Sequence, residues 1–407
     1  MGFQLPHGRS HHLYGGATLK ASITSVDVAA KRVLVREDLN VPISKGHITD
    51  DARIRAAVPT LQHLSQRGAL VVVMSHLGRP QGSSFDPELS LRPVATVLAK
   101  DLERKVDFAE DCVGDAAQSA VGRLQAGQVL LLENVRFHPE EEANDPDFAH
   151  RLASLGEMFV NDAFAASHRA HASVVGVAAY LPAYAGELME AELAALHQAL
   201  DHPRRPMVAV VGGAKVSTKV GVLTHLLKKV DALLIGGAMA NTFFKAQGLP
   251  TGNGLVEDSA LEVAKAVIKA GGDKLVLPVD LVCTQKIEAG QTLRVMPADA
   301  VEPGWSAVDI GPKSVALFSD RLRGAGAVVW NGPMGITEIP DFSEGTSAVG
   351  KAIAGSGAYT LVGGGDTVAA LDALGLAGFS HVSTGGGATL EYLEGKELPG
   401  VAILQDT

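Results

Sequence analysis

Residues 207–237, MVAVVGGAKVSTKVGVLTHLLKKVDALLIGG, contain the pattern that best predicts the fold class. It begins with one apolar run, Met207–Val211, and ends with another, Ala232–Ile235. Apolar runs of this length predict strands buried on both faces, as in a parallel sheet. The segment between them predicts a helix, because one helical face collects Val220, Leu223, Leu227 and Val230. A strand, a helix and a second strand in this order predict a crossover unit of an α/β fold.

The same alternation recurs along the rest of the chain. Further short apolar runs predict strands at Val33–Val35, Ala69–Met74, Val129–Leu132, Met158–Val160, Lys274–Leu277, Ala327–Trp330 and Tyr359–Val362. Another helical face is formed by Leu91, Val94, Leu98 and Leu102. Because the pattern starts afresh near residue 207, we expect two doubly wound, Rossmann-like parallel-sheet domains separated by a cleft.

The boundary between the two domains is predicted between Gly186 and Pro206. A helix is expected there on the spacing of Met189, Leu193, Leu196 and Leu200, and Pro203 and Pro206 close it. This helix either joins the two domains as a hinge or packs wholly in the first domain, and the clean restart of the strand pattern favours the hinge. We therefore expect domains at residues 21–187 and 188–393.

Composition narrows the class of protein. The chain has 407 residues, 46% of them apolar, and a formal net charge of −10, which argues against binding to nucleic acids or anionic membranes. The sequence has no apolar run of transmembrane length. Its two cysteines, Cys112 and Cys283, show no disulfide or metal spacing and are expected to be buried free thiols. We expect a cytoplasmic protein.

Residues 1–20 contain glycine and histidine and lack the apolar core of a secretory signal. We expect them to form a disordered extension. His11 and His12 as metal ligands are the less favoured alternative.

Basic and polar residues follow the predicted strands of the first half, where ligands bind in open α/β sheets. The segments are Arg36–Pro42, Ser75–Pro80, Glu133–His138 and Ser167–His171, and Arg53 opens a helix just beyond the first. A single arginine is more often part of a surface ion pair. Several arginines from separate loops predict a small-polyanion site, because the guanidinium fork matches phosphate and carboxylate. Asp38 and Asn40 add acceptors for a ligand hydroxyl.

Glycine follows the predicted strands of the second half. The segments are Gly212–Lys219, Gly236–Asn241, Asn331–Gly335, Gly363–Thr367 and Thr384–Gly387. Glycine lets the backbone approach a phosphate, and a following helix offers free N–H groups, so these loops predict a nucleotide site. The Walker A loop, the dinucleotide fingerprint and the protein-kinase signatures are missing from the sequence.

An anion site on one domain and a nucleotide site on the other predict a small-molecule phosphotransferase that closes to react. Two alternatives remain at this point. One is a dinucleotide-dependent dehydrogenase, which is also α/β and glycine-rich. The other is a non-catalytic ligand-binding or scaffold protein of the same fold.

The motifs in these loops resemble those of the phosphoglycerate kinase family from about Ile23 to the C-terminus. In order along the chain they are Arg-Glu-Asp-Leu-Asn-Val-Pro, Ser-His-Leu-Gly-Arg-Pro, Leu-Glu-Asn-Val-Arg-Phe, His-Arg-Ala-His, Gly-Gly-Ala-Lys-Val, Trp-Asn-Gly-Pro-Met-Gly and Gly-Gly-Gly-Asp-Thr. The resemblance implies reversible phosphoryl transfer from 1,3-bisphosphoglycerate to MgADP, giving 3-phosphoglycerate and MgATP in glycolysis and gluconeogenesis.

The resemblance also implies which residues bind each substrate. For 3-phosphoglycerate they are Asp38, Asn40, Arg53, His76, Arg79, Arg136 and Arg169. For ADP and ATP they are Lys219, Gly236, Gly237, Gly311, Asn331, Pro333, Glu338, Gly364, Gly365, Asp366 and Thr367. The family is typically monomeric, and its last residues, here about 394–407, return to the first domain. The sequence departs from the family pattern at Ala165–Ser167 and at Thr337, just before Glu338.

The expected chemistry needs no general base, because the attacking phosphate or carboxylate oxygen is already ionised near neutral pH. Arg53 and Lys219 are expected to hold the two polyanions and to offset the charge of the transferring group. The helix that begins near Gly386 is expected to present its N–H groups to that group. Asp366 is expected to be the one protein ligand of Mg²⁺.

Overall fold

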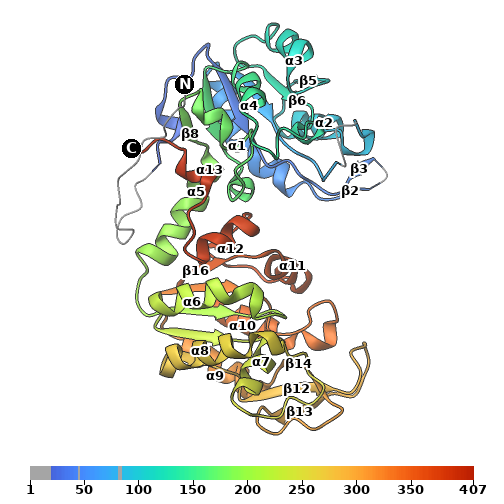
Figure 1. Cartoon of the computed structure of the whole chain (residues 1–407), viewed down its shortest axis with the longest axis vertical. Coiled ribbons are helices and arrows are strands. Elements are labelled where there is room, and N and C mark those ends of the chain that lie inside the picture. Colours follow the sequence, from blue (N-terminus) through green and yellow to red (C-terminus); the bar gives the residue numbers. More distant parts are fainter. Residues whose placement is uncertain (1–19, 45, 81–84) are drawn as a thin grey trace, which may run out of the picture.

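The computed structural model describes residues 20–44, 46–80 and 85–407. Figure 1 shows two lobes stacked along the long axis of the molecule. Each lobe is built on a six-stranded sheet. The predicted α/β fold with two parallel-sheet domains is confirmed. The prediction for residues 1–20, with His11 and His12, falls outside the described residues except at Lys20.

The first sheet has the strand order β5-β6-β4-β1-β7-β8, and its neighbouring strands are parallel. The strands are β1 (Arg32–Arg36), β4 (Leu70–Met74), β5 (Val106–Ala109), β6 (Val129–Leu132), β7 (Met158–Asn161) and β8 (Ala183–Ala185). Helices α1 (Ala52–Gln66) and α2 (Arg92–Asp101) cover one face, and α3 (Gly114–Val121) and α4 (Pro146–Ala153) cover the other. Alternate residues of one strand serve the two cores: Val33 and Val35 pack with Leu61, and Leu34 packs in the cluster of Phe148.

The second sheet has the order β11-β10-β9-β15-β16-β17 and is also parallel. Its strands are β9 (Met207–Val211), β10 (Ala232–Ile235), β11 (Leu275–Val276), β15 (Ala327–Asn331), β16 (Tyr359–Val362) and β17 (His381–Val382). The helices on one face are α6 (Val220–Lys229), α7 (Met239–Ala246), α8 (Leu261–Gly271) and α12 (Gly387–Leu393); those on the other are α9 (Pro312–Leu322), α10 (Glu344–Ala354) and α11 (Gly365–Leu374). Trp330 is the largest fully buried side chain.

Two small antiparallel elements were not predicted from the sequence. One is a sheet of β12 (Asp280–Thr284), β13 (Arg294–Pro297) and β14 (Ser306–Ile310), and the other is the pair β2 (Ile43–Ser44) and β3 (His47–Ile48). Strand β13 is mostly exposed, as at Val295 with 55% of its surface accessible. Strands β12 and β14 are mostly buried, but polar residues bound or interrupt their apolar residues, so they lack a long apolar run. The edge strands β5, β8 and β17 are too short to leave a clear run.

The predicted boundary helix is α5 (Glu187–Leu196), which runs between the two lobes in Figure 1. It ends earlier than expected: Leu200 lies in a following π-helical turn, His197–Asp201. The C-terminus returns to the first lobe through α13 (Pro399–Ala402), where the Gly400 N–H donates to the carbonyl of Ser167 over 2.9 Å. In the described part of the chain, no helix is long and apolar enough to cross a membrane.

Candidate functional site

The first lobe gathers basic side chains where β1, β4 and β6 end. Arg53, in the first turn of α1, donates to Asp38 Oδ2 over 2.8 Å and to the carbonyl of Asn40 over 3.2 Å. The Asn40 side chain accepts from the Gly78 N–H over 2.8 Å, and Arg136 donates to the Gly78 carbonyl over 2.7 Å. These bonds join three loops that are far apart in the sequence.

His76 lies within this basic group. Its Nδ1 is 3.0 Å from Nη2 of Arg36 and 4.0 Å from Oδ1 of Asp38. Burial lowers the His76 pKa well below its usual value, and the charges of Arg36, Arg136, Arg53 and Arg169 lower it further. His76 is therefore neutral at pH 7, and four guanidinium groups act on one imidazole. An anionic ligand would relieve their mutual repulsion.

The remaining predicted residues of this site differ in their hydrogen bonds and in their exposure to solvent. Arg169 donates to Nε2 of the neighbouring His168 over 3.2 Å. Arg79 follows Gly78 directly and is exposed to solvent. His171, half-buried nearby, has its pKa lowered to about 4 by burial and by the charge of Arg136.

The sequence did not predict the buried hydrogen bonds that support this site. Arg36 is fully buried, and its Nε donates to Ser173 Oγ over 2.8 Å. Ser173 in turn donates to the buried Glu141, from its hydroxyl over 2.6 Å and from its N–H over 2.8 Å. Glu141 occupies no apolar-face position of a predicted element, so no sequence signal distinguished it from a surface carboxylate.

In the second lobe, Asn331 connects the glycine-rich loops. Lys219 donates to Asn331 Oδ1, and Asn331 Nδ2 donates to the carbonyl of Gly363 over 2.8 Å. The Gly332 N–H donates to Thr367 Oγ1 over 2.7 Å. Burial lowers the Lys219 pKa, while the charge of Asp366 opposes that effect. The Lys219 ammonium group, the Asn331 amide and the start of α11 thus lie together at the carboxyl ends of β15 and β16.

Close backbone packing explains why glycine is required here. Gly364 has a φ of +97°, and a Cβ at this position would lie 2.6 Å from Asn331 Nδ2. A Cβ on Gly237 would lie 2.5 Å from the Gly213 nitrogen. Pro333 accepts from the Gly213 N–H over 3.1 Å, and a Cβ on Gly236 would meet the Met334 sulfur at 2.3 Å.

Four predicted nucleotide-binding residues lie outside this hydrogen-bonded and closely packed group. Gly365 and Asp366 are exposed in the first turn of α11, and Glu338 is exposed in the loop after β15. Gly311 precedes α9, where a Cβ would collide with the Asp280 carboxyl group at 2.4 Å.

The two lobes meet at the loop before α12. The fully buried Glu192 of α5 accepts from the Thr384 N–H over 2.7 Å and from its hydroxyl over 2.8 Å, and it pairs with His381 Nε2 at 2.9 Å. Glu192 follows Met189 by about one helical turn. A carboxylate on the apolar face of the predicted helix was the only indication in the sequence that Glu192 is buried. Although burial raises the Glu192 pKa, the hydrogen bond and charge of His381 keep it below its usual value.

Gly386 lies at this junction between the lobes. A Cβ on Gly385 would collide with the Phe164 ring at 2.3 Å, and one on Gly387 would touch the His168 ring at 3.3 Å. Asp38, Arg53, Leu188 and Thr384 line a small pocket beside it.

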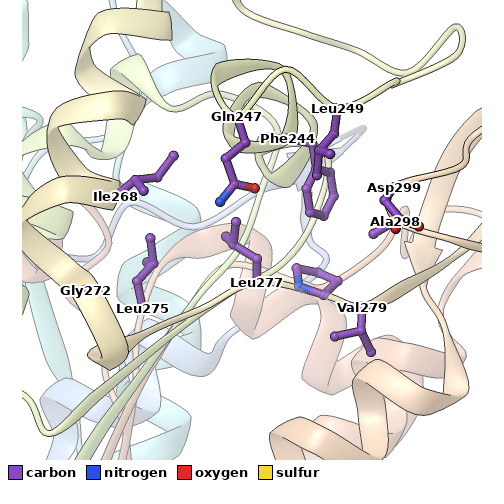
Figure 2. A pocket seen from close by; sticks show the side chains of 11 residues that line it. Phe244, Gln247, Leu249, Ile268, Gly272, Leu275, Leu277, Val279, Ala298 and Asp299 are labelled. Carbon is purple, nitrogen blue, oxygen red and sulfur yellow. The ribbon is translucent and has the colours of Figure 1, made fainter.

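A larger pocket, of about 410 Å³, lies elsewhere in the second lobe. Figure 2 shows Phe244 and Leu249 on one side of it and Leu275 and Leu277 on the other. None of the predicted site residues lines it.

Both cysteines are buried free thiols, as predicted. One of them belongs to a spatial group that the sequence spacing did not indicate: ligand atoms of Asp111, Cys112 and His138 lie within 4.8 Å of one another. Asp111 Oδ1 is already engaged by His138 Nε2 at 2.7 Å and by the Cys112 N–H at 2.7 Å. Burial raises the Cys112 pKa well above its usual value, so the thiol is protonated at pH 7. A hydrogen bond between His138 and Asp111 beside a buried thiol accounts for the group.

Two parallel-sheet lobes, one with a cationic pocket and one with glycine loops around a lysine, define the class of hinge-joined small-molecule phosphotransferases. Residues 23–396 match the family model "Phosphoglycerate kinase". The chain belongs to the phosphoglycerate kinase family. It is a phosphotransferase of glycolysis, and the dehydrogenase and scaffold alternatives are wrong.

Relatives support this assignment over nearly the whole chain. The phosphoglycerate kinase of Moorella thermoacetica is 52% identical over 391 residues, covering 95% of this chain and 99% of that protein. That of Chloroflexus aggregans is 53% identical over 397 residues, with the same coverage. Among solved structures, the phosphoglycerate kinase from Coxiella burnetii superposes with a TM-score of 0.89 at 46% identity, covering 94% of this chain and 98% of the other. The enzyme from Pyrococcus horikoshii OT3 gives 0.82 at 32% identity, with the same coverage.

Proposed function

We propose that this chain catalyses reversible phosphoryl transfer from 1,3-bisphosphoglycerate to MgADP, giving 3-phosphoglycerate and MgATP. The observation that carries the proposal is the group of arginines around the neutral His76. A pocket with this excess of positive charge is suited to a small ligand that bears both phosphate and carboxylate groups.

The first lobe, residues 21–187 with about 394–407, is proposed to bind 3-phosphoglycerate. The proposed ligands are Asp38, Asn40, Arg53, His76, Arg79, Arg136 and Arg169. The Arg53 side chain is 41% exposed and its guanidinium is held by Asp38, so Arg53 is oriented yet accessible to a ligand. The carboxylate of Asp38 also offers an acceptor for the hydroxyl of the substrate.

The second lobe, residues 188–393, is proposed to bind the nucleotide. The proposed ligands are Lys219, Gly236, Gly237, Gly311, Asn331, Pro333, Glu338, Gly364, Gly365, Asp366 and Thr367. Support comes from the N-terminus of α11, whose unpaired N–H groups favour a phosphate, and from Lys219, which Asn331 orients.

Asp366 is proposed as the protein ligand of Mg²⁺. Its carboxylate is exposed in the first turn of α11 and is close enough to Lys219 to influence its charge. Within the described ranges, Asp366 does not belong to any cluster of three potential metal-binding side chains. A single carboxylate fits Mg²⁺, which keeps several waters and binds largely through substrate phosphates. The ion would neutralise charge on the phosphates and orient them.

Catalysis is proposed to rest on positioning and charge, without a general base. Arg53 approaches the transferring group from the first lobe, Lys219 approaches it from the second, and the backbone at Gly386 lies where the lobes meet. Alignment of two bound reactants can supply roughly 7–11 kcal/mol of the barrier. Closure about α5 would exclude water, which otherwise hydrolyses the acyl phosphate.

The enzyme is further proposed to act as a monomer in the cytoplasm. The proposed 3-phosphoglycerate site and the proposed nucleotide site, the two half-sites of the enzyme, belong to one chain. Helix α5 and the returning C-terminus connect its lobes. The family typically works in this form.

A coupled assay with 3-phosphoglycerate and ATP, with and without Mg²⁺, tests the proposal. We expect turnover that requires 3-phosphoglycerate, ATP and Mg²⁺ together. Turnover of another phosphate acceptor, with none of 3-phosphoglycerate, would contradict the substrate assignment.

A further inference from the structure

The start of the hinge helix α5 is held by residues of the first lobe. Its N-cap residue, Gly186, has no side chain with which to cap the free N–H groups of the first turn. Thr60 Oγ1 of α1 accepts from the Glu187 N–H over 2.9 Å, and Asp162 Oδ1 accepts from the Met189 N–H over 2.9 Å. A Cβ on Gly186 would lie 2.2 Å from that oxygen, so glycine gives Asp162 its access.

Asp162 faces a second carboxyl group, that of Glu37. Both side chains are fully buried and lie within hydrogen-bonding reach of each other. Glu37 Oε1, Glu37 Oε2 and Asp162 Oδ2 accept no hydrogen bond from the part of the protein that the structure describes. Two buried carboxylates would repel each other, whereas one proton between them supplies the missing donor.

Among the residues that the structure describes, no cationic side chain forms a salt bridge with either carboxyl group of this pair. The charged groups that act on it are Arg36 and Asp38, on either side of Glu37, and Glu187 from α5. Arg36 directs its guanidinium to Ser173, to His76 and to the backbone carbonyl of Glu37. Burial raises the pKa of Glu37 well above its usual value, and burial raises that of Asp162 to about 6.

We propose that Asp162 is a positioning residue for phosphoryl transfer, which fixes the start of α5 against α1, and that Glu37 holds it there by sharing one proton. Helix α1 carries Arg53 in its first turn, and α5 carries Glu192, which grips Thr384 of the second lobe. The contacts of Thr60 in α1 and of Asp162 at the end of β7 with the start of α5 therefore set how the two half-sites meet on closure. This role rests on the proposed division of the site between the lobes.

The shared proton is tested without any assay of activity. Infrared difference spectra between the wild type and Glu37→Gln at neutral pH should show the C=O stretch of a protonated, water-excluded carboxylic acid in the wild type alone. The matched control is Glu141→Gln, because Glu141 is buried in the same lobe but accepts two hydrogen bonds from Ser173. This variant should keep the band. A wild-type spectrum without the band would overturn the shared proton.

Unfolding gives a second readout of the same proton. The folded pair keeps its proton above about pH 5, whereas an unfolded Glu37 has lost it, so folding stability falls as the pH rises. From about pH 5 to 6, the unfolding constant of the wild type should rise about tenfold more than that of Glu37→Gln. Equal slopes in the two proteins would contradict the proposal.

The positioning role is tested by kinetics of two Asp162 variants. Asp162→Ala removes one of the two side-chain caps of α5 and should lower kcat about tenfold, with both KM values within about twofold of the wild type. Asp162→Asn keeps the acceptor for Met189 and places an amide N–H toward Glu37, so its kcat should stay within about twofold. Asp162→Ala with a wild-type kcat, or Asp162→Asn as slow as Asp162→Ala, would overturn the role. Far-ultraviolet circular dichroism at the assay temperature shows that each variant is folded.

Discussion

The two lobes share one sheet architecture but build their half-sites from different parts of the chain. In the first lobe the site consists of side chains, as where Arg53 and Asp38 pair across the end of β1. In the second it consists of closely packed backbone, as where Gly364 lies on Asn331. A small polyanion is thus recognised by concentrated side-chain charge, and a polyphosphate by glycine loops and helix N-termini. Substitutions in the two lobes should therefore change different properties of the enzyme.

The largest effect is expected at Arg53. Arg53→Ala removes a charge aimed at the transferring group and should lower kcat on the order of 100- to 1,000-fold, with a much smaller change in nucleotide KM. Steady-state kinetics in both directions measure it. The matched control is Arg55→Ala, because Arg55 lies on the same helix but is exposed and pairs with Asp51. A near-wild-type kcat in Arg53→Ala would remove that residue from the mechanism.

The next effect is expected on nucleotide affinity. Asp366→Ala removes the one proposed protein ligand of Mg²⁺ and should weaken MgADP binding about tenfold, as measured by calorimetry. Binding of 3-phosphoglycerate should be unchanged. Asp372→Ala, an exposed change on the same helix, serves as the control. Unaltered MgADP affinity in Asp366→Ala would refute the metal assignment.

Gly364→Ala tests the role of the backbone in the second lobe. Gly364 and Gly375 both have positive φ angles, but only a Cβ on Gly364 meets a neighbour. Both alanine variants should lose about 1–2 kcal/mol of unfolding free energy from the backbone strain. Gly364→Ala should lose more and should also bind ADP more weakly, because it displaces Asn331. Identical losses in urea unfolding and identical ADP affinity would show that the close approach is unimportant.

The smallest effect at neutral pH is expected at His171. Its imidazole stays neutral down to about pH 4 in the folded protein because burial and Arg136 lower its pKa, whereas the unfolded residue takes up a proton below about pH 6.5. This contribution to stability is therefore lost as the pH falls from about 6.5 to 4. His171→Gln should flatten the pH dependence of unfolding by on the order of 1–2 kcal/mol across that window. The exposed His47→Gln is the control, and equal slopes for His171→Gln and the wild type would contradict the prediction.

Much of the fold was readable because buried parallel strands leave continuous apolar runs, such as Met207–Val211. Strands that are half exposed, such as β13, leave no such run and were missed. The π-helical end of α5 was also missed, since Leu200 continues the helical spacing while the hydrogen-bonding pattern changes. Periodicity reports which side chains are buried and not how the backbone is bonded.

The same limit applies to the half-sites. Arg136 was predicted from its position at a strand end and from its residue type, and Asn331 was predicted from the family resemblance. The supports beneath them were not: Glu37 and Asp162 meet only because β1 and β7 are neighbours in the sheet. A buried carboxyl group looks like a surface carboxyl group until its three-dimensional neighbours are known.

Hydrogen–deuterium exchange with each ligand alone shows whether each lobe binds one substrate. We expect 3-phosphoglycerate to protect the loops around Arg53, His76 and Arg136 from exchange, and MgADP to protect those around Lys219 and Gly364. Protection of the same lobe by both ligands would show that the substrates are not divided between the lobes.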